Sequence, residues 1–387
     1  KLDPAVFIHF DTTRDYLRAL ETCVQTFASC GWSRQAASWM SLPPSPAHAD
    51  RLVAANAFLG EVSATTGFLL DSLIEGKLRM GEGCLLANVV ADRASLSLEP
   101  RLVLHQLPLQ SSFYATRLFG VDDDPKRSVA DGGTFLNKPW KEWIESGLLA
   151  ASDLWPDGGK SGHCTLWNAR LYPVCASREE SLELVLWLQS PDSVPASFIS
   201  RWRESQRLSL QETYHQADVR RVVGEQCRIA DLVRARHFCA GLERERPARA
   251  LAPLLGRERD AARRARNVAD WLENASDPWL PLRGYRALAV ATGDHRWEDR
   301  AFSSLARLVR AHTPYWSSTG DELRTTTQRV TVSAAARIDF GGGWTDTPPY
   351  SLECGGTVLN AAITLWHRYP ITAEATLLDE PVLVLES

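Results

Sequence analysis

Residues 74–104 read IEGKLRMGEGCLLANVVADRASLSLEPRLVL and repeat with a period of six. Two rows of positions six residues apart are apolar, with Asp92 as the exception. An α-helix has about 3.6 residues per turn, so a period of six does not return to one helix face, whereas it fits the sides of a triangular coil with alternate side chains inside. The stretch predicts a parallel β-helix, and ordinary antiparallel strands that stay in phase are the alternative. The rows are Leu78, Cys84, Val90, Leu96 and Leu102, and Met80, Leu86, Asp92, Leu98 and Leu104.

Length and composition place the chain among globular proteins. It has 387 residues and a mass of 43.0 kDa, enough for two or three domains at about 100–200 residues each. Hydrophobic residues make up 44% and charged residues 23%, which excludes a disordered tail protein. The sequence has no run of about 18 apolar residues, so no membrane contact is expected. A net charge of −4 excludes a generally basic nucleic-acid coat.

Eight cysteines are spread thinly and form no Cys-x-x-Cys pair. This pattern predicts reduced thiols in the cytoplasm and argues against a disulfide framework. His163 and Cys164, with Cys175, come nearest to a ligand cluster, but their spacing fits no usual structural zinc site. We therefore expect no metal site. The cysteines are Cys23, Cys30, Cys84, Cys164, Cys175, Cys227, Cys239 and Cys354.

Both ends of the sequence indicate a piece of a longer protein. Residues 6–10 predict a short strand, and two threonines at 12 and 13 then predict the N-cap of a helix that continues to Val24. At the other end, residues 382–385 form an apolar, strand-like run. Natural domains rarely end on an unpaired apolar strand, because an open edge promotes aggregation.

Residues 111–177 form a transition region with two ambiguous groups. Asp122-Asp123-Asp124 precedes Pro125, and we expect solvated side chains in a turn rather than metal ligands. Gly132-Gly133 predicts a simple turn, with a phosphate-binding loop as the alternative. Residues 140–149 predict a helix that carries aromatic side chains.

Residues 178–313 have apolar residues three and four positions apart, which predicts about six packed helices. Between residues 243 and 266, eight arginines stand against four acidic residues. Nucleic-acid binding is one interpretation of that charge. Because acids are interspersed and no aromatic residues alternate with the arginines, a solvated helical face is favoured.

Residues 337–349, RIDFGGGWTDTPP, concentrate groups suited to a sugar and a phosphate. Three glycines permit close backbone approach to a ligand. Asp346 offers two acceptor oxygens for neighbouring hydroxyls, and Arg337 could offset charge on a transferred phosphoryl group. The double proline would stiffen the loop and lower the cost of ordering it. Gly355-Gly356 permits a second close approach, and a tight turn with a surface salt bridge is the alternative.

This segment resembles the first motif of the GHMP sugar kinases, the L-fucokinases in particular. The match covers residues 337–349 and then 355–360, GGTVLN. Residues 133–140, GTFLNKPW, together with 153–155 and 169–174, resemble the fucose-1-phosphate guanylyltransferase portion of GDP-L-fucose pyrophosphorylase. The resemblance therefore spans most of the chain and is weakest in the helical middle.

The resemblance implies an enzyme that transfers the γ-phosphoryl group of ATP to the anomeric hydroxyl of L-fucose. It implies ATP and Mg²⁺ as cofactors of the intact parent, and a sugar and a nucleotide as its partners. It assigns Arg337 to catalysis near the transferred phosphate. The implied sugar-binding positions are Asp346, Gly342, Gly343 and Trp344, with Glu353, Gly355, Gly356 and Asn360 as further candidates.

The resemblance also implies a mixed, multidomain fold: a parallel, left-handed β-helix, an α-helical middle, and the N-terminal start of an α+β GHMP kinase domain. We place the boundaries at 1–45 (the end of a nucleotidyltransferase-like region), 46–177 (the β-helix and transition region), 178–325 (helices) and 326–387 (the kinase start).

The sequence lacks several motifs of the family, among them the later catalytic aspartate and the C-terminal glycine-rich motif of the kinases and the nucleotidyltransferase signature Gly-x-Gly-Gly-Ala-Thr. The ATP-binding loop Pro-x-x-x-Gly-Leu-Gly-Ser-Ser is absent, so we expect this piece to bind no cofactor and to be inactive alone. A related kinase for another sugar, such as a heptose phosphate, is a second hypothesis. A non-catalytic β-helix and helical scaffold with a relic sugar motif is a third.

Overall fold

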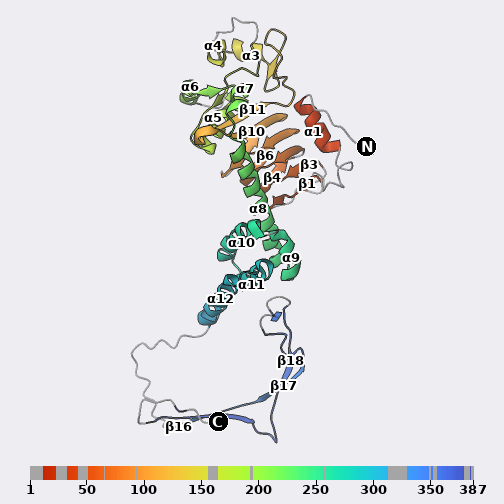
Figure 1. The fold of residues 1–387 in the computed structure, drawn as a ribbon, viewed down its shortest axis with the longest axis vertical. Helices are drawn as coiled ribbons and strands as arrows, with labels where there is room; N and C mark the ends of the chain where they lie inside the picture. Colours follow the sequence, from red (N-terminus) through yellow and green to blue (C-terminus); the bar gives the residue numbers. More distant parts are fainter. Residues whose placement is uncertain are drawn as a thin grey trace. The chain divides into compact units, whose positions relative to one another are not determined.

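The computed structural model describes residues 12–22, 33–41, 51–64, 66–92, 95–155, 164–191, 195–256, 258–312, 329–347, 350–351, 355–378 and 384. The chain divides into two compact units, Lys1–His237 and Phe238–Ser387 (Figure 1). The strands predicted at residues 6–10 and 382–385 lie mostly or wholly outside the described residues.

The first unit contains a β-solenoid whose neighbouring coils pair in parallel, as the six-residue period predicts. One ladder runs in the order β1-β3-β5-β7-β10, and a second in the order β2-β4-β6-β8, with β9 also paired to β6. Only the last pair in the first ladder, β10 with β11, is antiparallel among the described solenoid strands. The bounds are β1 Gln35–Ala36, β2 Trp39–Met40, β3 Leu52–Ala55, β4 Phe58–Ala64, β5 Gly67–Leu70, β6 Leu73–Met80, β7 Cys84–Ala87, β8 Val90–Ala91, β9 Ser95–Leu98, β10 Leu102–Pro108 and β11 Tyr114–Gly120.

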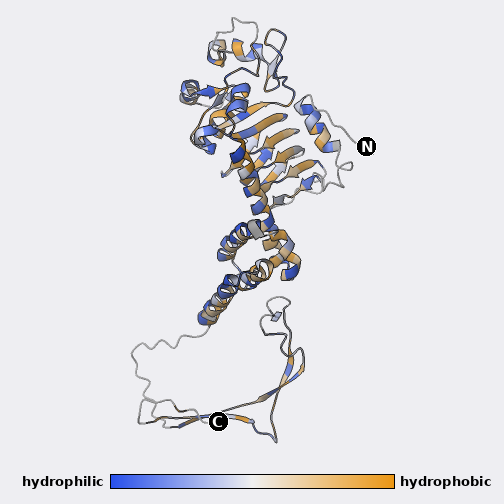
Figure 2. Cartoon of the chain, in the orientation of Figure 1, coloured by the Kyte–Doolittle hydropathy of each residue, from blue (hydrophilic) through white to orange (hydrophobic). Residues whose placement is uncertain are grey.

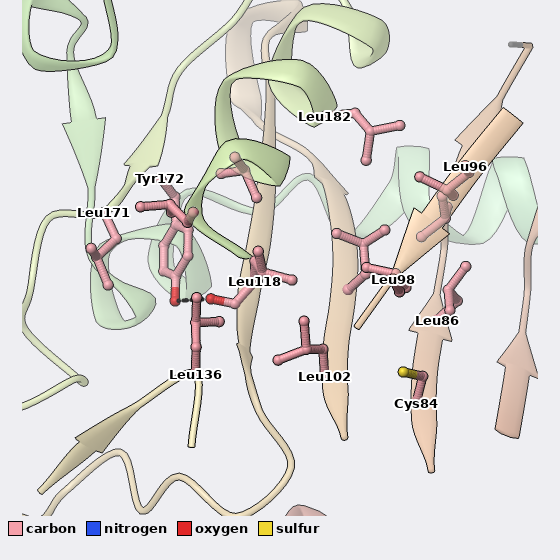
Figure 3. Close-up of a cluster of buried hydrophobic side chains, with 14 of the residues drawn as sticks. Cys84, Leu86, Leu96, Leu98, Leu102, Leu118, Leu136, Leu171, Tyr172 and Leu182 are labelled. Atoms are coloured by element: carbon pink, nitrogen blue, oxygen red, sulfur yellow. Dashed lines mark hydrogen bonds between the residues drawn. The ribbon is translucent and has the colours of Figure 1, made fainter. Parts of the chain in front are cut away.

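The interior of the solenoid is filled by the two predicted rows, with one shift. Eight of the ten row positions belong to one buried core: Leu78, Cys84, Leu96, Leu102, Met80, Leu86, Leu98 and Leu104. Figure 2 colours the ribbon of these strands by hydropathy, and Figure 3 shows part of the core as side chains. The inward placement of Val90 is wrong. Its neighbour Ala91 is the buried core residue, whereas Val90 packs outward beside Leu73 and Ile229. Asp92 is exposed, which fits its polar side chain.

Polar residues with left-handed backbone form the corners between coils. Asn56, Asp71 and Asn88 have φ angles of 51°, 49° and 53°, and asparagine and aspartate tolerate this region better than other non-glycine residues. The amide of Asn56 donates to Asp71 at 2.7 Å, and Gln226 of α8 donates to Asp71 at 3.0 Å and to Asn88 at 3.2 Å. Burial raises the pKa of Asp71. This corner ladder also ties helix α8 (Val219–Glu243) to the solenoid.

Helix α1 (Thr13–Thr22) lies on the outer face of the first ladder, where Leu17 joins a small cluster with Val53, Phe68 and Val103. The predicted threonine cap is confirmed at Thr12, whose hydroxyl accepts from the Asp15 amide at 3.2 Å.

The rest of the first unit adds short elements that extend the same core. They are η2 Gln110–Ser112, β12 Thr134–Phe135, β13 Lys138–Pro139, α3 Trp140–Glu145, α4 Ala151–Leu154, β14 Tyr172–Pro173, α5 Arg178–Leu186, η3 Trp187–Gln189, α6 Ala196–Glu204, β15 Arg207–Leu208 and α7 Leu210–Gln216. The helix predicted over 140–149 is shorter than expected, because it ends at Glu145. Tyr172 is fully buried and its hydroxyl donates to the Leu118 carbonyl at 3.3 Å (Figure 3).

The second unit contains helices and two strand pairs. Its helices are the end of α8, then α9 Ala248–Leu255, α10 Glu258–Glu273, α11 Leu280–Thr292 and α12 Arg296–His312. Within the described part of 178–312, α5 to α12 make eight α-helices where about six were predicted, since several are only two turns long. Most described arginines of 243–266 are exposed, as expected of a solvated face, but Arg264 is buried and donates to the Leu255 carbonyl at 2.7 Å.

The strand pairs of the second unit are antiparallel. β16 (Arg329–Ala334) pairs with β19 (Ile371–Thr376), and β17 (Ala336–Gly341) pairs with β18 (Leu359–Ile363). All residues of β16 and β19 are exposed. The expected GHMP kinase domain thus stays a prediction, while the β-helix and the helical middle are confirmed.

Candidate functional site

The β17–β18 hairpin brings together the two glycine-containing motifs of the sequence. Arg337 lies on β17 and Asn360 on β18, where Asn360 pairs in register with Asp339. Residues 342–347 follow β17 directly, and residues 355–358 precede β18. Antiparallel pairing of these strands therefore places the ends of the 342–358 loop next to each other. Glu353 lies outside the described residues, as does the double proline.

Two glycines of the motifs permit contact between chain segments. A Cβ atom on Gly342 would stand 1.9 Å from the Thr357 carbonyl oxygen, and one on Gly356 would stand 2.0 Å from the Thr345 carbonyl oxygen. Both contacts are with backbone, so no side-chain movement could relieve them. Gly342 also has a φ angle of 75°, which other residues rarely adopt. The sequence predicted that these glycines approach a ligand, but at these two positions the close neighbour is the loop itself.

Thr345 joins the two halves of the loop. Its hydroxyl lies 2.6 Å from the Gly342 carbonyl and 3.0 Å from the Thr357 carbonyl, and it accepts a hydrogen bond from the Thr357 amide at 3.2 Å. Our sequence reasoning did not single out this residue. Its threonine side chain beside a glycine triplet was the available signal, because a short hydroxyl side chain commonly bonds to nearby backbone.

Arg337 is held by a carboxylate on its own strand. Its Nε lies 2.9 Å from Asp339 Oδ1 and its Nη2 lies 3.0 Å from Asp339 Oδ2. Residues two apart on a strand share a face, so this pair needs no distortion of the backbone. The contact orients the guanidinium and offsets part of its charge, while 58% of the Arg337 side chain stays exposed. Sequence reasoning quoted Asp339 in the motif but gave it no role.

Trp344 and Asp346 present their side chains to solvent from the loop. Trp344 is 82% exposed and has a φ angle of 71°, a conformation that is rare for a bulky residue. Asp346 is exposed, and Gly343 has room around its Cα, with Asp339 Oδ2 as the nearest atom to an added Cβ at 3.6 Å. Gly355 has a φ angle of 69° and open space beside it. These groups can meet a ligand that approaches the loop.

The loop itself carries no cation that could hold nucleotide phosphates. Residues 342–358 read GGWTDTPPYSLECGGTV and include two acids and no lysine, arginine or histidine. Across the described residues, no group of three His, Cys, Asp or Glu side chains could hold a metal ion. Residues 342–358 therefore supply no cationic side chain for nucleotide phosphates.

In the first unit, the acidic triplet lies at a turn as expected, but the prediction of solvated side chains is wrong for two of its three members. Asp123 is buried, and its carboxylate accepts from the amides of Gly120, Leu136 and Asn137 at 2.6, 2.9 and 3.0 Å and from the Thr134 hydroxyl at 2.7 Å. Burial raises the pKa of Asp123, although these hydrogen bonds oppose the rise.

Asp122 is also paired rather than solvated. It forms ion pairs with Arg14 of α1 and Arg101, and its pKa is lowered because hydrogen bonds from these arginines outweigh burial. Asp124 alone of the triplet is exposed. Gly132 and Gly133 lie in a turn, where the Gly133 amide donates to the Ser128 carbonyl at 2.8 Å.

The GTFLNKPW motif therefore has a structural role around Asp123. Phe135 stacks on Trp140 with ring centroids 5.1 Å apart, and the Trp143 indole donates to the Phe135 carbonyl at 2.9 Å. Residues 154–155 and 169–172 are buried in the same core, apart from Arg170. The motifs of the first unit thus build the core, whereas those of the second unit expose polar groups.

Two further findings concern the described residues of both units. The described cysteines Cys84, Cys164, Cys175, Cys227 and Cys239 carry free thiols. Within the described residues, no helix combines the length and hydrophobicity needed to span a membrane.

Comparison with known proteins supports the resemblance drawn from the motifs. Residues 1–177 match the family described as the Fucose pyrophosphorylase domain. A bifunctional fucokinase/GDP-fucose pyrophosphorylase of Arabidopsis thaliana is 30% identical over 293 residues, which cover 65% of this chain and 27% of the relative. An L-fucokinase/L-fucose-1-P guanylyltransferase of Bacteroides fragilis is 24% identical over 314 residues, which cover 78% of this chain and 31% of the relative.

The chain thus spans less than a third of the length of these curated relatives. No solved structure matches it significantly. The likeness to fucokinase-type proteins is confirmed, and the residue roles inferred from it stay predictions.

Proposed function

We propose that this chain, a homologue of bifunctional fucokinase/GDP-fucose pyrophosphorylase proteins, is part of an L-fucose salvage enzyme. In this proposal, residues 326–387 begin a GHMP-type kinase domain. That domain transfers the γ-phosphoryl group of ATP to the anomeric hydroxyl of L-fucose in the cytoplasm. The ATP-binding loop of this kinase family is absent from the sequence, so in this proposal ATP and Mg²⁺ bind to parts of the enzyme outside this chain, and the chain by itself catalyses no turnover.

The observation that carries this proposal is the loop on the β17–β18 hairpin, whose two halves are joined by hydrogen bonds. The hydrogen bonds of Thr345 and the two close glycine contacts hold the backbone on both sides of the loop. The Cα position of Asp346, from which its carboxylate extends, is therefore fixed. A carboxylate accepts from two adjacent hydroxyls, which suits a sugar. The neighbouring indole of Trp344 offers an apolar surface to the ring face of a deoxyhexose. Glu353 and Asn360 remain further candidates for the sugar hydroxyls.

Arg337 is proposed as the catalytic cation. Its bidentate pair with Asp339 orients the guanidinium, and the donors that Asp339 leaves free can meet oxygens of a transferred phosphoryl group.

A second activity of the same enzyme is favoured by the match of residues 1–177. We propose that the solenoid belongs to the GDP-L-fucose pyrophosphorylase half and serves as its scaffold. Support comes from the burial of the apolar residues of the 133–140 and 169–174 motifs, because core side chains are unavailable to a substrate; these residues are Phe135, Leu136, Trp140, Ala169, Leu171 and Tyr172. The nucleotide-binding chemistry of that half then lies elsewhere in the enzyme.

The kinase proposal is tested with the protein expressed from its entire gene. We expect Asp346→Ala to lower kcat/KM for L-fucose about 100-fold or more, because two charge-assisted hydrogen bonds of about 1.5–3 kcal/mol each are lost. Glu374→Ala, an exposed carboxylate change on β19, is the matched control and should leave activity unchanged. Full activity in Asp346→Ala would remove this residue from the site. Phosphorylation of heptose 7-phosphate in place of L-fucose would favour the related-kinase hypothesis.

A further inference from the structure

A cavity of about 380 Å³ lies between α10 and the turn that joins α11 to α12. It belongs to the helical region of the second unit, and none of the fucokinase motifs contributes to it. Its wall combines small side chains with three arginines and a single acid. The lining residues are Ala261, Ala262, Arg266, Thr292, Asp294, Arg296, Trp297 and Arg300.

The single acid of the cavity, Asp294, forms an ion pair with Arg296, which is also a lining residue. Asp294 Oδ2 lies 2.8 Å from Arg296 Nη2, and Asp294 Oδ1 lies 3.0 Å from Arg296 Nε. Asp294 also accepts from the Arg296 amide at 3.1 Å, so its position is fixed by the start of α12. Its charge therefore offsets that of Arg296, and the lining holds no further acid for Arg266 or Arg300.

Arg300 and Arg266 are the other two arginines of the lining, and they differ in their partners. Arg300 stacks on the Trp297 ring with a centroid distance of 5.3 Å and pairs with Glu273 at 3.2 Å, which restrains its side chain without burying it. Arg266 is exposed, and no ion pair joins it to a described residue. An arginine with free donors beside a second, preoriented arginine is a suitable receptor for an anion with several oxygens.

The floor of the cavity leaves room for such an anion. Ala261 and Ala262 project no atoms beyond Cβ, and the Thr292 hydroxyl is turned to the backbone, since it donates to the Leu288 carbonyl at 2.7 Å. The remaining space exceeds the size of a phosphate group, so a small organic group attached to the phosphate is also accommodated.

We propose that this cavity binds the phosphate group of a small molecule, with Arg266 as the principal ligand and Arg300 as its partner. The chemistry recognised is a phosphate dianion, either free or as a monoester. This site is separate from the hairpin loop and does not depend on the proposed kinase activity.

The test uses the 387-residue chain and three probes in calorimetric titrations at matched ionic strength: inorganic phosphate, α-D-glucose 1-phosphate and chloride. We expect one saturable site for the phosphate probes and none for chloride. A monoester that binds at least tenfold more tightly than inorganic phosphate would identify an esterified ligand, whereas equal affinity would identify free phosphate.

Two variants separate the cavity from general surface charge. Arg266→Ala should weaken phosphate binding about tenfold or more, because it removes the guanidinium that pairs with no described acid. Arg249→Ala removes an exposed arginine of α9 outside the cavity lining and should change the affinity less than twofold. Circular dichroism checks that both variants keep the helical content. Equal weakening in both variants, or no saturable phosphate binding by the unaltered chain, would overturn the proposal.

Discussion

Replacing the buried carboxylate of Asp123 should destabilise the first unit strongly, even when shape is kept. Its Oδ1 accepts from the Thr134 hydroxyl and the Asn137 amide, and its Oδ2 accepts from the Gly120 and Leu136 amides. In Asp123→Asn, one of these oxygens becomes an NH₂ group that faces two donors, whichever way the amide is turned.

The magnitude follows from the groups left without an acceptor. Each buried, unsatisfied donor costs about 1–3 kcal/mol, so two of them cost about 2–6 kcal/mol. Burial opposes the native carboxylate, as its raised pKa indicates, and removing that charge recovers part of the loss. We therefore expect Asp123→Asn to lower the free energy of unfolding by about 3 kcal/mol.

The assay is urea unfolding followed by tryptophan fluorescence, because the buried Trp140 and Trp143 pack beside this network. Asp124→Asn makes the same chemical change at the exposed neighbouring position and should alter the unfolding free energy by less than about 0.5 kcal/mol. A loss below about 1 kcal/mol in Asp123→Asn would refute the view that this carboxylate organises the GTFLNKPW motif.

Two further predictions concern pH and the hairpin loop. Burial, together with the neighbouring Arg117, lowers the pKa of His105 from 6.5 to about 3. Between pH 6.5 and about 3, His105 is therefore protonated in the unfolded chain but neutral in the native chain. The free energy of unfolding should fall as the pH drops below 6.5, by at most about 1.4 kcal/mol per pH unit. His105→Gln should flatten this slope in urea unfolding between pH 7 and 5, and an unchanged slope would contradict the assignment. In the loop, Gly356→Ala should speed amide hydrogen exchange at Thr357 at least tenfold, since its Cβ would overlap the Thr345 carbonyl. Gly341→Ala meets no atom within 4 Å and should leave this exchange rate unchanged, and equal effects of the two variants would show that the loop contact is unimportant.

The solenoid was predictable because its interior repeats, and the error at Val90 shows the limit of that argument. Successive paired positions Ala54, Leu69, Leu86 and Leu104 are 15, 17 and 18 residues apart, so the coils differ in length. A strict period of six fits a coil of eighteen residues. Asn88, whose backbone is in the left-handed region, forms the corner before β8, and after it the inward-facing position is Ala91 instead of Val90. The sequence pattern contains no signal for the length of each corner.

The candidate site was predictable in composition and less so in geometry. The motif located the residues of the hairpin loop, but the pairing of Gly342 with Thr357 depends on two segments 15 residues apart. Similarly, three adjacent aspartates look equivalent in sequence, although one is buried, one is paired with arginines and one is exposed. Those differences arise from contacts with distant residues, which local patterns do not encode.

The most direct test of the account is the product formed by the protein from its entire gene with ATP, Mg²⁺ and L-fucose, followed by ³¹P NMR. We predict a new phosphate signal coupled to the anomeric proton of fucose, with its rate of appearance strongly reduced in Asp346→Ala. Absence of any fucose phosphate from an enzyme that is folded and phosphorylates another sugar would contradict the central claim.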